Sequence, residues 1–218
     1  MEFFLQLQQA TPWLHLLPLL VALVGGLLRF YRLPLALRYL VGAVAWSLTI
    51  ELAAAALRLQ HLPNLLLIPL DVVGELTLLA LMYQAALRSA ALNRWLPIGL
   101  ALFASYALLS MLDAPVAVKF RADLQITENC LLLALVVLYF RQLLSQLTVR
   151  RLEREPLFWV SAGLFIYCLG KIQIVLFSDY LLLHYSRQFN QAVWGVHKLL
   201  IMVLNSSYAV ALWMRPRK

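Results

Sequence analysis

Apolar residues run in long, nearly unbroken stretches along the chain, and short polar segments separate these stretches. A helix needs about 20 mainly apolar residues to cross a bilayer. The stretches are too long for strands and lack the alternation of apolar and polar positions that strands show. They therefore predict an all-α, polytopic transmembrane bundle of seven helices in a single domain, residues 1–218, with breaks at residues such as Pro34, Asn93 and Pro156. The expected spans are residues 12–30, 36–58, 64–86, 95–112, 125–146, 157–179 and 190–213.

The composition excludes several classes of protein. Hydrophobic residues make up 63% of the 218 residues and charged residues only 13%, against about 45–50% and about 25% in a soluble domain. A soluble domain of this length has too much surface for its volume to hide so many apolar side chains. A soluble globular enzyme, a disordered chain and a secreted disulfide scaffold are therefore excluded, and an integral membrane protein is expected.

The basic residues predict the orientation of the bundle, because cytoplasmic loops of membrane proteins are enriched in Lys and Arg. Twelve of them fall at one set of alternating span ends: Arg29, Arg32, Arg38, Arg88, Arg94, Arg141, Arg150, Arg151, Arg154, Arg215, Arg217 and Lys218. Four fall at the other set: Arg58, Lys119, Arg121 and Arg187. The N-terminus is therefore expected outside and the C-terminus in the cytoplasm.

Ionisable side chains inside the expected spans are the main functional signal. A charge near the centre of a membrane helix costs at least ~2.5–3.5 kcal/mol, so such residues usually face the protein interior and mark a site. We expect a pocket in the outer half of the membrane, in which Lys171, with Lys198 as a second candidate, pairs with carboxylates. The expected ligand-binding or switch residues are Glu51, Asp71, Glu75, Glu128, Lys171, Trp194, His197, Lys198 and Asn205.

Some of these residues also have a plainer interpretation. Asp71 and Glu128 can lie at the interface between membrane and water. Lys198 can extend its aliphatic side chain toward the outer surface, so that its ammonium group reaches water. Asn205 can join neighbouring helices by a hydrogen bond. The residues that these alternatives explain least are Glu51, Glu75, Lys171 and His197.

Spacing places several polar residues on common helix faces. Asp71 and Glu75 are four residues apart and therefore share one face. In the last span, polar and aromatic residues recur every three or four positions and form one stripe that suits the wall of a small-molecule pocket. The members of this stripe are Asn190, Trp194, His197, Ile201, Asn205 and Tyr208.

A short motif occurs twice and suggests an internal repeat. Residues 29–35 and 151–157 both follow the pattern R-x-x-R-x-P-L, and both introduce a span. At the same offset, Glu75 corresponds to His197. The pattern is consistent with parallel repeats of three spans joined by the fourth, a 3+1+3 arrangement that occurs in transporters. Arginine-rich inner loops with a proline at the start of the next helix also arise without a repeat.

Three functions fit this pattern. We favour a receptor-like membrane sensor that binds a small ligand or a proton and signals to a cytoplasmic partner at Arg150, Arg151 and Arg154. The first alternative is a small-solute or proton-coupled transporter that uses the same carboxylates. The second alternative is an intramembrane lipid-modifying enzyme, in which Asp71 and Glu75 would work with His197 as acid and base.

No metal, cofactor or catalytic nucleophile is expected. The four histidines, at positions 15, 61, 184 and 197, lack the spacing of metal ligands. Cys130 and Cys168 both lie in apolar runs, which is typical of reduced packing residues. Interaction with nucleic acid is not expected either, because membrane topology explains the net charge of +8.

Two resemblances accompany these observations. Seven spans with an outer N-terminus resemble the plan of microbial rhodopsins, G-protein-coupled receptors and PQ-loop sugar transporters, although the rhodopsin lysine motif and the Pro-Gln pairs are absent. The run PLFWVSAGLFIY at residues 156–167, together with WGVHK at residues 194–198, is similar to short seven-span proteins of bacteria. This similarity implies a bacterial inner-membrane protein.

Overall fold

The computed structural model describes residues 16–62, 64–112, 122–145, 152–184 and 186–214 of the chain. Within these ranges the protein is all-helical and contains no strand. The α-helices are α2 (Leu16–Arg29), α3 (Leu35–Leu59), α4 (Ile68–Leu87), α5 (Ala90–Leu112), α6 (Ala122–Ser145), α7 (Pro156–His184) and α8 (Arg187–Trp213). The short 3-10 helices are η1 (Phe30–Arg32), η2 (Asn64–Leu67) and η3 (Leu152–Arg154).

Six of the seven helices, α3 to α8, are long and apolar enough to cross a membrane. These properties fit the multi-pass membrane protein that the sequence predicts. Helix α2 has 14 described residues, and the first four residues of its expected range lie outside the described part of the chain.

One expected helix break is wrong. Asn93 lies inside α5, which begins at Ala90. The break falls earlier, at Arg88, whose φ of 48° is left-handed and ends α4. A left-handed residue at a helix C-terminus is usually Gly or Asn, so the sequence does not mark this position.

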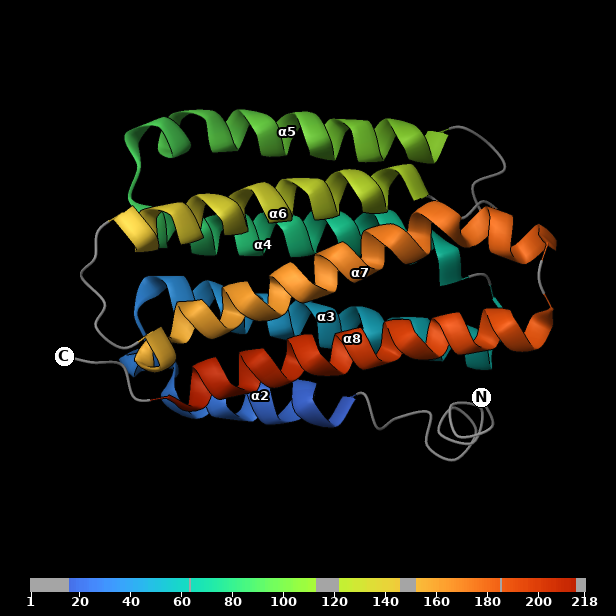
Figure 1. Cartoon of the computed structure of the whole chain (residues 1–218), viewed down its shortest axis with the longest axis horizontal. Helices are drawn as coiled ribbons and strands as arrows, with labels where there is room; N and C mark the ends of the chain where they lie inside the picture. Colours follow the sequence, from blue (N-terminus) through green and yellow to red (C-terminus); the bar gives the residue numbers. More distant parts are fainter. Residues whose placement is uncertain (1–15, 63, 113–121, 146–151, 185, 215–218) are drawn as a thin grey trace.

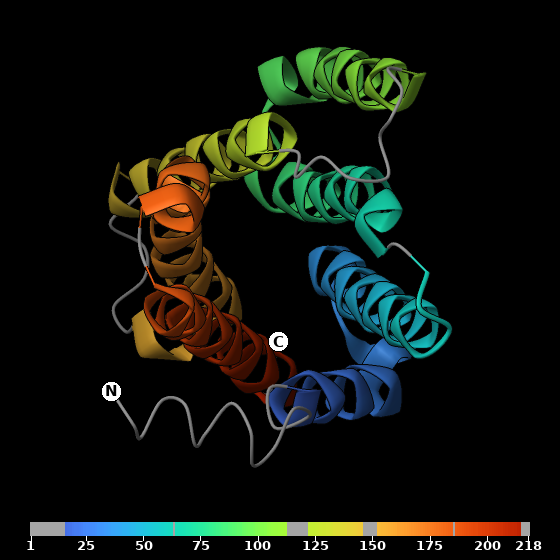
Figure 2. The ribbon, with the colours of Figure 1, turned by 90° about the vertical axis from the view of Figure 1, so that its right-hand side faces the viewer.

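Six helices form a closed ring, and α5 lies outside it. Around the ring the order is α2, α3, α4, α6, α7 and α8, and α8 packs back against α2 (Figure 2). Helix α5 packs mainly against α4. Many of its apolar side chains, such as Leu102, Leu108 and Leu109, are exposed, as expected for a surface that contacts lipid.

The two ends of the bundle differ in charge. At the end shown on the left in Figure 1 lie η1, the C-termini of α4, α6 and α8, and the N-termini of α5 and α7. We call it the arginine end, because its described basic residues are Arg29, Arg32, Arg38, Arg88, Arg94, Arg141 and Arg154. The described basic residues at the opposite end are Arg58 and Arg187. Which end faces the cytoplasm remains a prediction of the positive-inside rule.

Large buried side chains fill the ring at its arginine end. Tyr83 of α4 is fully buried, and a hydrogen bond of 2.8 Å joins its hydroxyl to that of Ser161 on α7. The ring of Tyr139 on α6 lies 6.0 Å from that of Tyr83. Leucines from other helices, including Leu37 and Leu212, complete this packing. Side chains therefore fill the interior at the arginine end, and the polar groups lie farther from this end.

Close packing between ring helices depends on glycines. An added Cβ at Gly74 of α4 would collide with the indole of Trp46 on α3. At Gly163 of α7 it would collide with the side chain of Ser207 on α8. Small residues that let two helix backbones approach are typical of membrane bundles.

Replacing Gly163 tests this packing. The added methyl group of Gly163→Ala meets a buried Ser207 whose hydroxyl already donates to the Leu204 carbonyl. Overpacking of this kind costs about 1–3 kcal/mol, so we expect a lower midpoint of thermal unfolding in detergent. Gly99→Ala on α5 is the control, since no described atom lies within 4 Å of its added Cβ. Equal unfolding midpoints for the two variants would contradict the α7–α8 contact.

Candidate functional site

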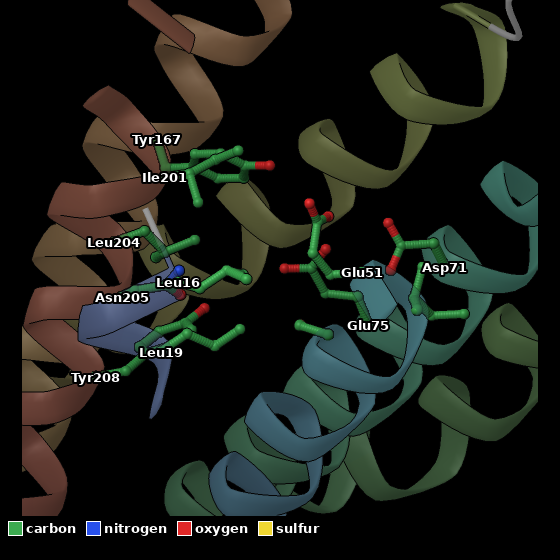
Figure 3. Close-up of a pocket in the computed structure, with 12 residues that line it drawn as sticks. Leu16, Leu19, Glu51, Asp71, Glu75, Tyr167, Ile201, Leu204, Asn205 and Tyr208 are labelled. Atoms are coloured by element: carbon green, nitrogen blue, oxygen red, sulfur yellow. The ribbon is translucent and has the colours of Figure 1, made fainter. Parts of the chain in front are cut away.

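A cavity of about 110 Å³ lies inside the ring, between α3 and α4 on one side and α2, α7 and α8 on the other (Figure 3). Three carboxylates line the α3–α4 side: Glu51 of α3, and Asp71 and Glu75 of α4. The two α4 residues share one face, as their spacing predicts. The remaining lining residues are Leu16, Leu19, Ser47, Ile50, Tyr167, Ile201, Leu204, Asn205 and Tyr208.

Neutral polar groups face these carboxylates from the other side of the cavity. They come from Tyr167 on α7 and from Asn205 and Tyr208 on α8 (Figure 3). Ile201, Asn205 and Tyr208 belong to the stripe expected on the last span, and all three line the cavity. The stripe therefore faces the interior of the ring.

The Tyr208 hydroxyl lacks a hydrogen-bond partner. The residue is only 3% exposed, and no described group forms a hydrogen bond with its buried oxygen. A buried hydroxyl without a partner costs about 1–3 kcal/mol. This group is therefore available to a bound molecule or to water in the cavity.

A buried ion pair lies beside the cavity. Lys171 Nζ of α7 is 3.3 Å from Glu128 Oε2 of α6, and the two side chains are 8% and 0% exposed. The sequence predicts that Lys171 pairs with a carboxylate, and Glu128 is that partner. The Lys171 ammonium also lies 5.3 Å from the centre of the Tyr167 ring. Tyr167 thus connects the ion pair to the cavity wall.

His197 belongs to an aromatic group next to the ion pair. Its ring stacks on Tyr167 at 6.0 Å, and Trp194 packs edge-on against it at 5.6 Å. The buried Nδ1 of His197 has no partner in the described part of the chain. His197 thus contacts Tyr167 but is not among the residues that line the cavity.

The second basic contact involves Glu51, whose Oε1 lies 3.7 Å from the Arg58 guanidinium. Arg58 is one of the few basic residues at the end opposite the arginine end, and its side chain is 55% exposed. The distance and the exposure describe a weak, water-accessible pair. This contact was not expected from the sequence, although the seven-residue spacing of the two residues on α3 is compatible with it.

The structure brings together some expected site residues and separates others. Glu51, Asp71, Glu75 and Asn205 line the cavity. Glu128, Lys171, His197 and Trp194 lie in the adjacent layer. Lys198 lines no part of the cavity and forms no ion pair with any described residue. Whether these residues bind a ligand or act as a switch remains a prediction.

The sequence analysis did not assign other lining residues to the site. Ser47 lies one helical turn before Glu51, a spacing that could have marked it as a neighbour on the same face. Leu16, Leu19 and Ile50 carry no polar group, so nothing distinguishes them in sequence from residues that face lipid.

The three residues of the enzymatic alternative do not all line the cavity. His197 does not join Asp71 and Glu75 in the cavity wall. No group of three His, Cys, Asp or Glu within the described ranges could hold a metal ion. Comparisons add no assignment, since no family model matches the chain and no match was found among curated proteins or solved structures.

Removing the lysine of the buried pair should destabilise the protein strongly. Lys171→Met leaves the Glu128 carboxylate buried without its cation, a change that costs about 3–5 kcal/mol. We expect the double variant Glu128→Gln/Lys171→Met to recover much of this loss, because both charges are then absent. Thermal unfolding of the two single variants and the double variant measures the coupling. Lys198→Met is the control, and strictly additive effects at 128 and 171 would argue against the pair.

Glu155 is a titratable residue outside the spans, at the arginine end. Glu155 follows η3 directly and is half-buried, and this burial raises the pKa of its carboxyl above the ordinary value of 4.5. As the pH rises past 4.5, the Glu155 carboxyl loses its proton in the unfolded chain but keeps it in the folded protein. Stability is lost over that interval, up to the pKa of the folded state.

Glu155→Gln should remove this loss, because glutamine does not ionise. We expect equal midpoints of unfolding for wild type and variant near pH ~4, and a higher midpoint for the variant near pH ~8. Exposed Glu153 in η3 provides the matched control. A Glu153→Gln variant that shows the same pH-dependent gain would mean that burial of Glu155 is not the cause.

Proposed function

We propose that this protein is a receptor-like membrane sensor that binds a small ligand in the cavity and signals to a separate cytoplasmic protein. The observation that carries the proposal is a cavity with carboxylates on one wall and an unpartnered hydroxyl on the other. A concave site with a few convergent polar groups is the usual form of a small-molecule site. Its expected location is the inner membrane of a bacterium, with the arginine end in the cytoplasm.

The packing of the arginine end supports a binding site over a passage through the membrane. Between the cavity and this end lie buried side chains such as Tyr83, Leu37 and Leu212. A solute in the cavity would have to displace this packing to cross. A sensor needs no such displacement, since only a shift of helices must reach the cytoplasmic side.

Helix α4 offers a direct mechanical route for that shift. It carries Asp71 and Glu75 in the cavity and Tyr83 two turns farther toward the arginine end. The hydrogen bond between the hydroxyls of Tyr83 and Ser161 connects α4 to the first turns of α7. Directly before α7 lies η3 with exposed Arg154, one of the three arginines proposed to meet the partner. Arg150 and Arg151 lie outside the described residues.

A transporter is the second candidate, and the order of helices in the ring favours it. The ring divides into α2–α4 and α6–α8, with α5 outside as the connector. Within the two R-x-x-R-x-P-L motifs, η1 and η3 occupy equivalent positions, and each precedes a ring helix. We propose that the halves are parallel repeats, an arrangement known in transporters.

A cavity-filling variant tests the proposed site. Ser47→Leu introduces a larger side chain into the cavity wall, whereas Thr49→Leu changes an exposed residue on the same helix. Both hydroxyls donate to the carbonyl four residues earlier, so each variant loses the same kind of bond. We expect at least one compound from a panel of anionic, neutral and cationic metabolites to raise the unfolding midpoint of wild type and Thr49→Leu, but not of Ser47→Leu. At a hundredfold excess over Kd, binding stabilises by about 2.7 kcal/mol.

Uptake into liposomes then separates the two candidates. A sensor binds the compound without accumulating it inside the vesicles, and hydrogen exchange at residues 152–158 changes on binding. Accumulation that Ser47→Leu abolishes would establish the transporter instead. If no compound distinguishes Ser47→Leu from Thr49→Leu, the cavity is not a ligand site and both candidates fail.

A further inference from the structure

We infer that the ligand of the cavity is a small organic cation, with an ammonium group held by Asp71, Glu75 and Tyr208 and a short hydrocarbon part. This inference rests on the proposed function, because it names the chemical class that the same cavity would bind.

The charge of the cavity wall is the first argument. Three of the lining residues are carboxylic acids, and none of the twelve described lining residues is Lys, Arg or His. Glu51 has the Arg58 guanidinium at 3.7 Å. Asp71 and Glu75 form no ion pair with any described residue. Carboxylates taken out of water without a compensating charge are costly, so this wall favours a bound cation.

Lys171, the buried cation next to the cavity, already has an ion-pair partner. Lys171 is 3.3 Å from Glu128, a carboxylate that is not part of the cavity wall. The Lys171 ammonium lies 5.3 Å from the centre of the Tyr167 ring, and Tyr167 itself lines the cavity (Figure 3). Glu128 thus has an ion-pair partner inside the protein, whereas Asp71 and Glu75 have none among the described residues.

The Tyr208 hydroxyl is the second, independent argument. It lies opposite the carboxylates, is buried, and has no partner among the described groups. A phenol oxygen accepts a hydrogen bond, and an ammonium carries three donors and no acceptor. An ammonium group bound between the two walls would donate to the carboxylates on one side and to this hydroxyl on the other. Charge-assisted bonds of this type are the stronger class of hydrogen bond.

The rest of the wall favours an organic cation over a metal ion. No three acidic, His or Cys side chains in the described ranges are close enough to hold a metal. Five lining residues are aliphatic: Leu16, Leu19, Ile50, Ile201 and Leu204. A cavity of about 150 Å³ accommodates benzene, so a volume of about 110 Å³ suits a chain of a few carbon atoms.

The test measures binding of three ammonium compounds to the full chain in nanodiscs at constant pH and ionic strength. The compounds are methylammonium, n-butylammonium and 1,4-butanediammonium, each compared with the alcohol of the same shape. We expect n-butylammonium to bind to wild type, while n-butanol does not. Glu75→Gln should weaken this binding about tenfold or more, since one charge-assisted bond is lost. Tyr208→Phe, which removes only the hydroxyl, should weaken it without loss of the fold.

Glu153→Gln is the matched control, because it removes an exposed carboxylate far from the cavity. Equal binding of amine and alcohol, unchanged affinity in both Glu75→Gln and Asp71→Asn, or displacement of the amine by Ca²⁺ or Na⁺ at equal ionic strength would each overturn the inference. So would absence of amine binding together with stabilisation by Glu75→Gln, which would mean that protons neutralise the wall. If an anionic or neutral metabolite binds in a Ser47-dependent manner and no amine does, this inference fails while the proposed function stands.

Discussion

A charged side chain inside a bilayer must face other protein groups, and this constraint determines the orientation of the helices in the ring. The exposed faces carry apolar side chains, such as those of Leu102 and Leu109 on α5. Asp71 and Glu75 of α4 point into the cavity, and Glu128 of α6 pairs with Lys171 of α7 inside the bundle. Because polar groups need partners in such a medium, the same constraint gathers them in one layer of the bundle.

Much of this architecture could be predicted from the sequence, because long apolar stretches and helical spacing are strong physical signals. Twenty apolar residues in a row have few alternatives to a membrane helix, and the described helices lie at the expected ranges. The face shared by Asp71 and Glu75 follows from helical geometry alone. The inward direction of Asn205 and Tyr208 follows from the periodic stripe to which they belong.

The parts that escaped prediction depend on which helices become neighbours. Nothing in the sequence says that Lys171 meets Glu128 of α6 and not a carboxylate of α4, since carboxylates of several spans were candidates. The position of α5 outside the ring was equally hidden, because its hydropathy resembles that of the other spans. The break at Arg88 was missed because an arginine rarely adopts the left-handed conformation that ends a helix.

Glu128 has a counter-ion, whereas Asp71 and Glu75 have none among the described residues. This difference bears on the role of the two sets of carboxylates. A buried ion pair such as Glu128–Lys171 can often be replaced by apolar residues without loss of stability. Stability alone therefore does not account for it, and still less for Asp71 and Glu75, which have no ion-pair partner within the described chain. Lys171 pairs with Glu128 at 3.3 Å and does not itself line the cavity. Under the proposal made above, the acidic wall is a preformed site, and a bound cation supplies the countercharge that Asp71 and Glu75 lack among the described residues.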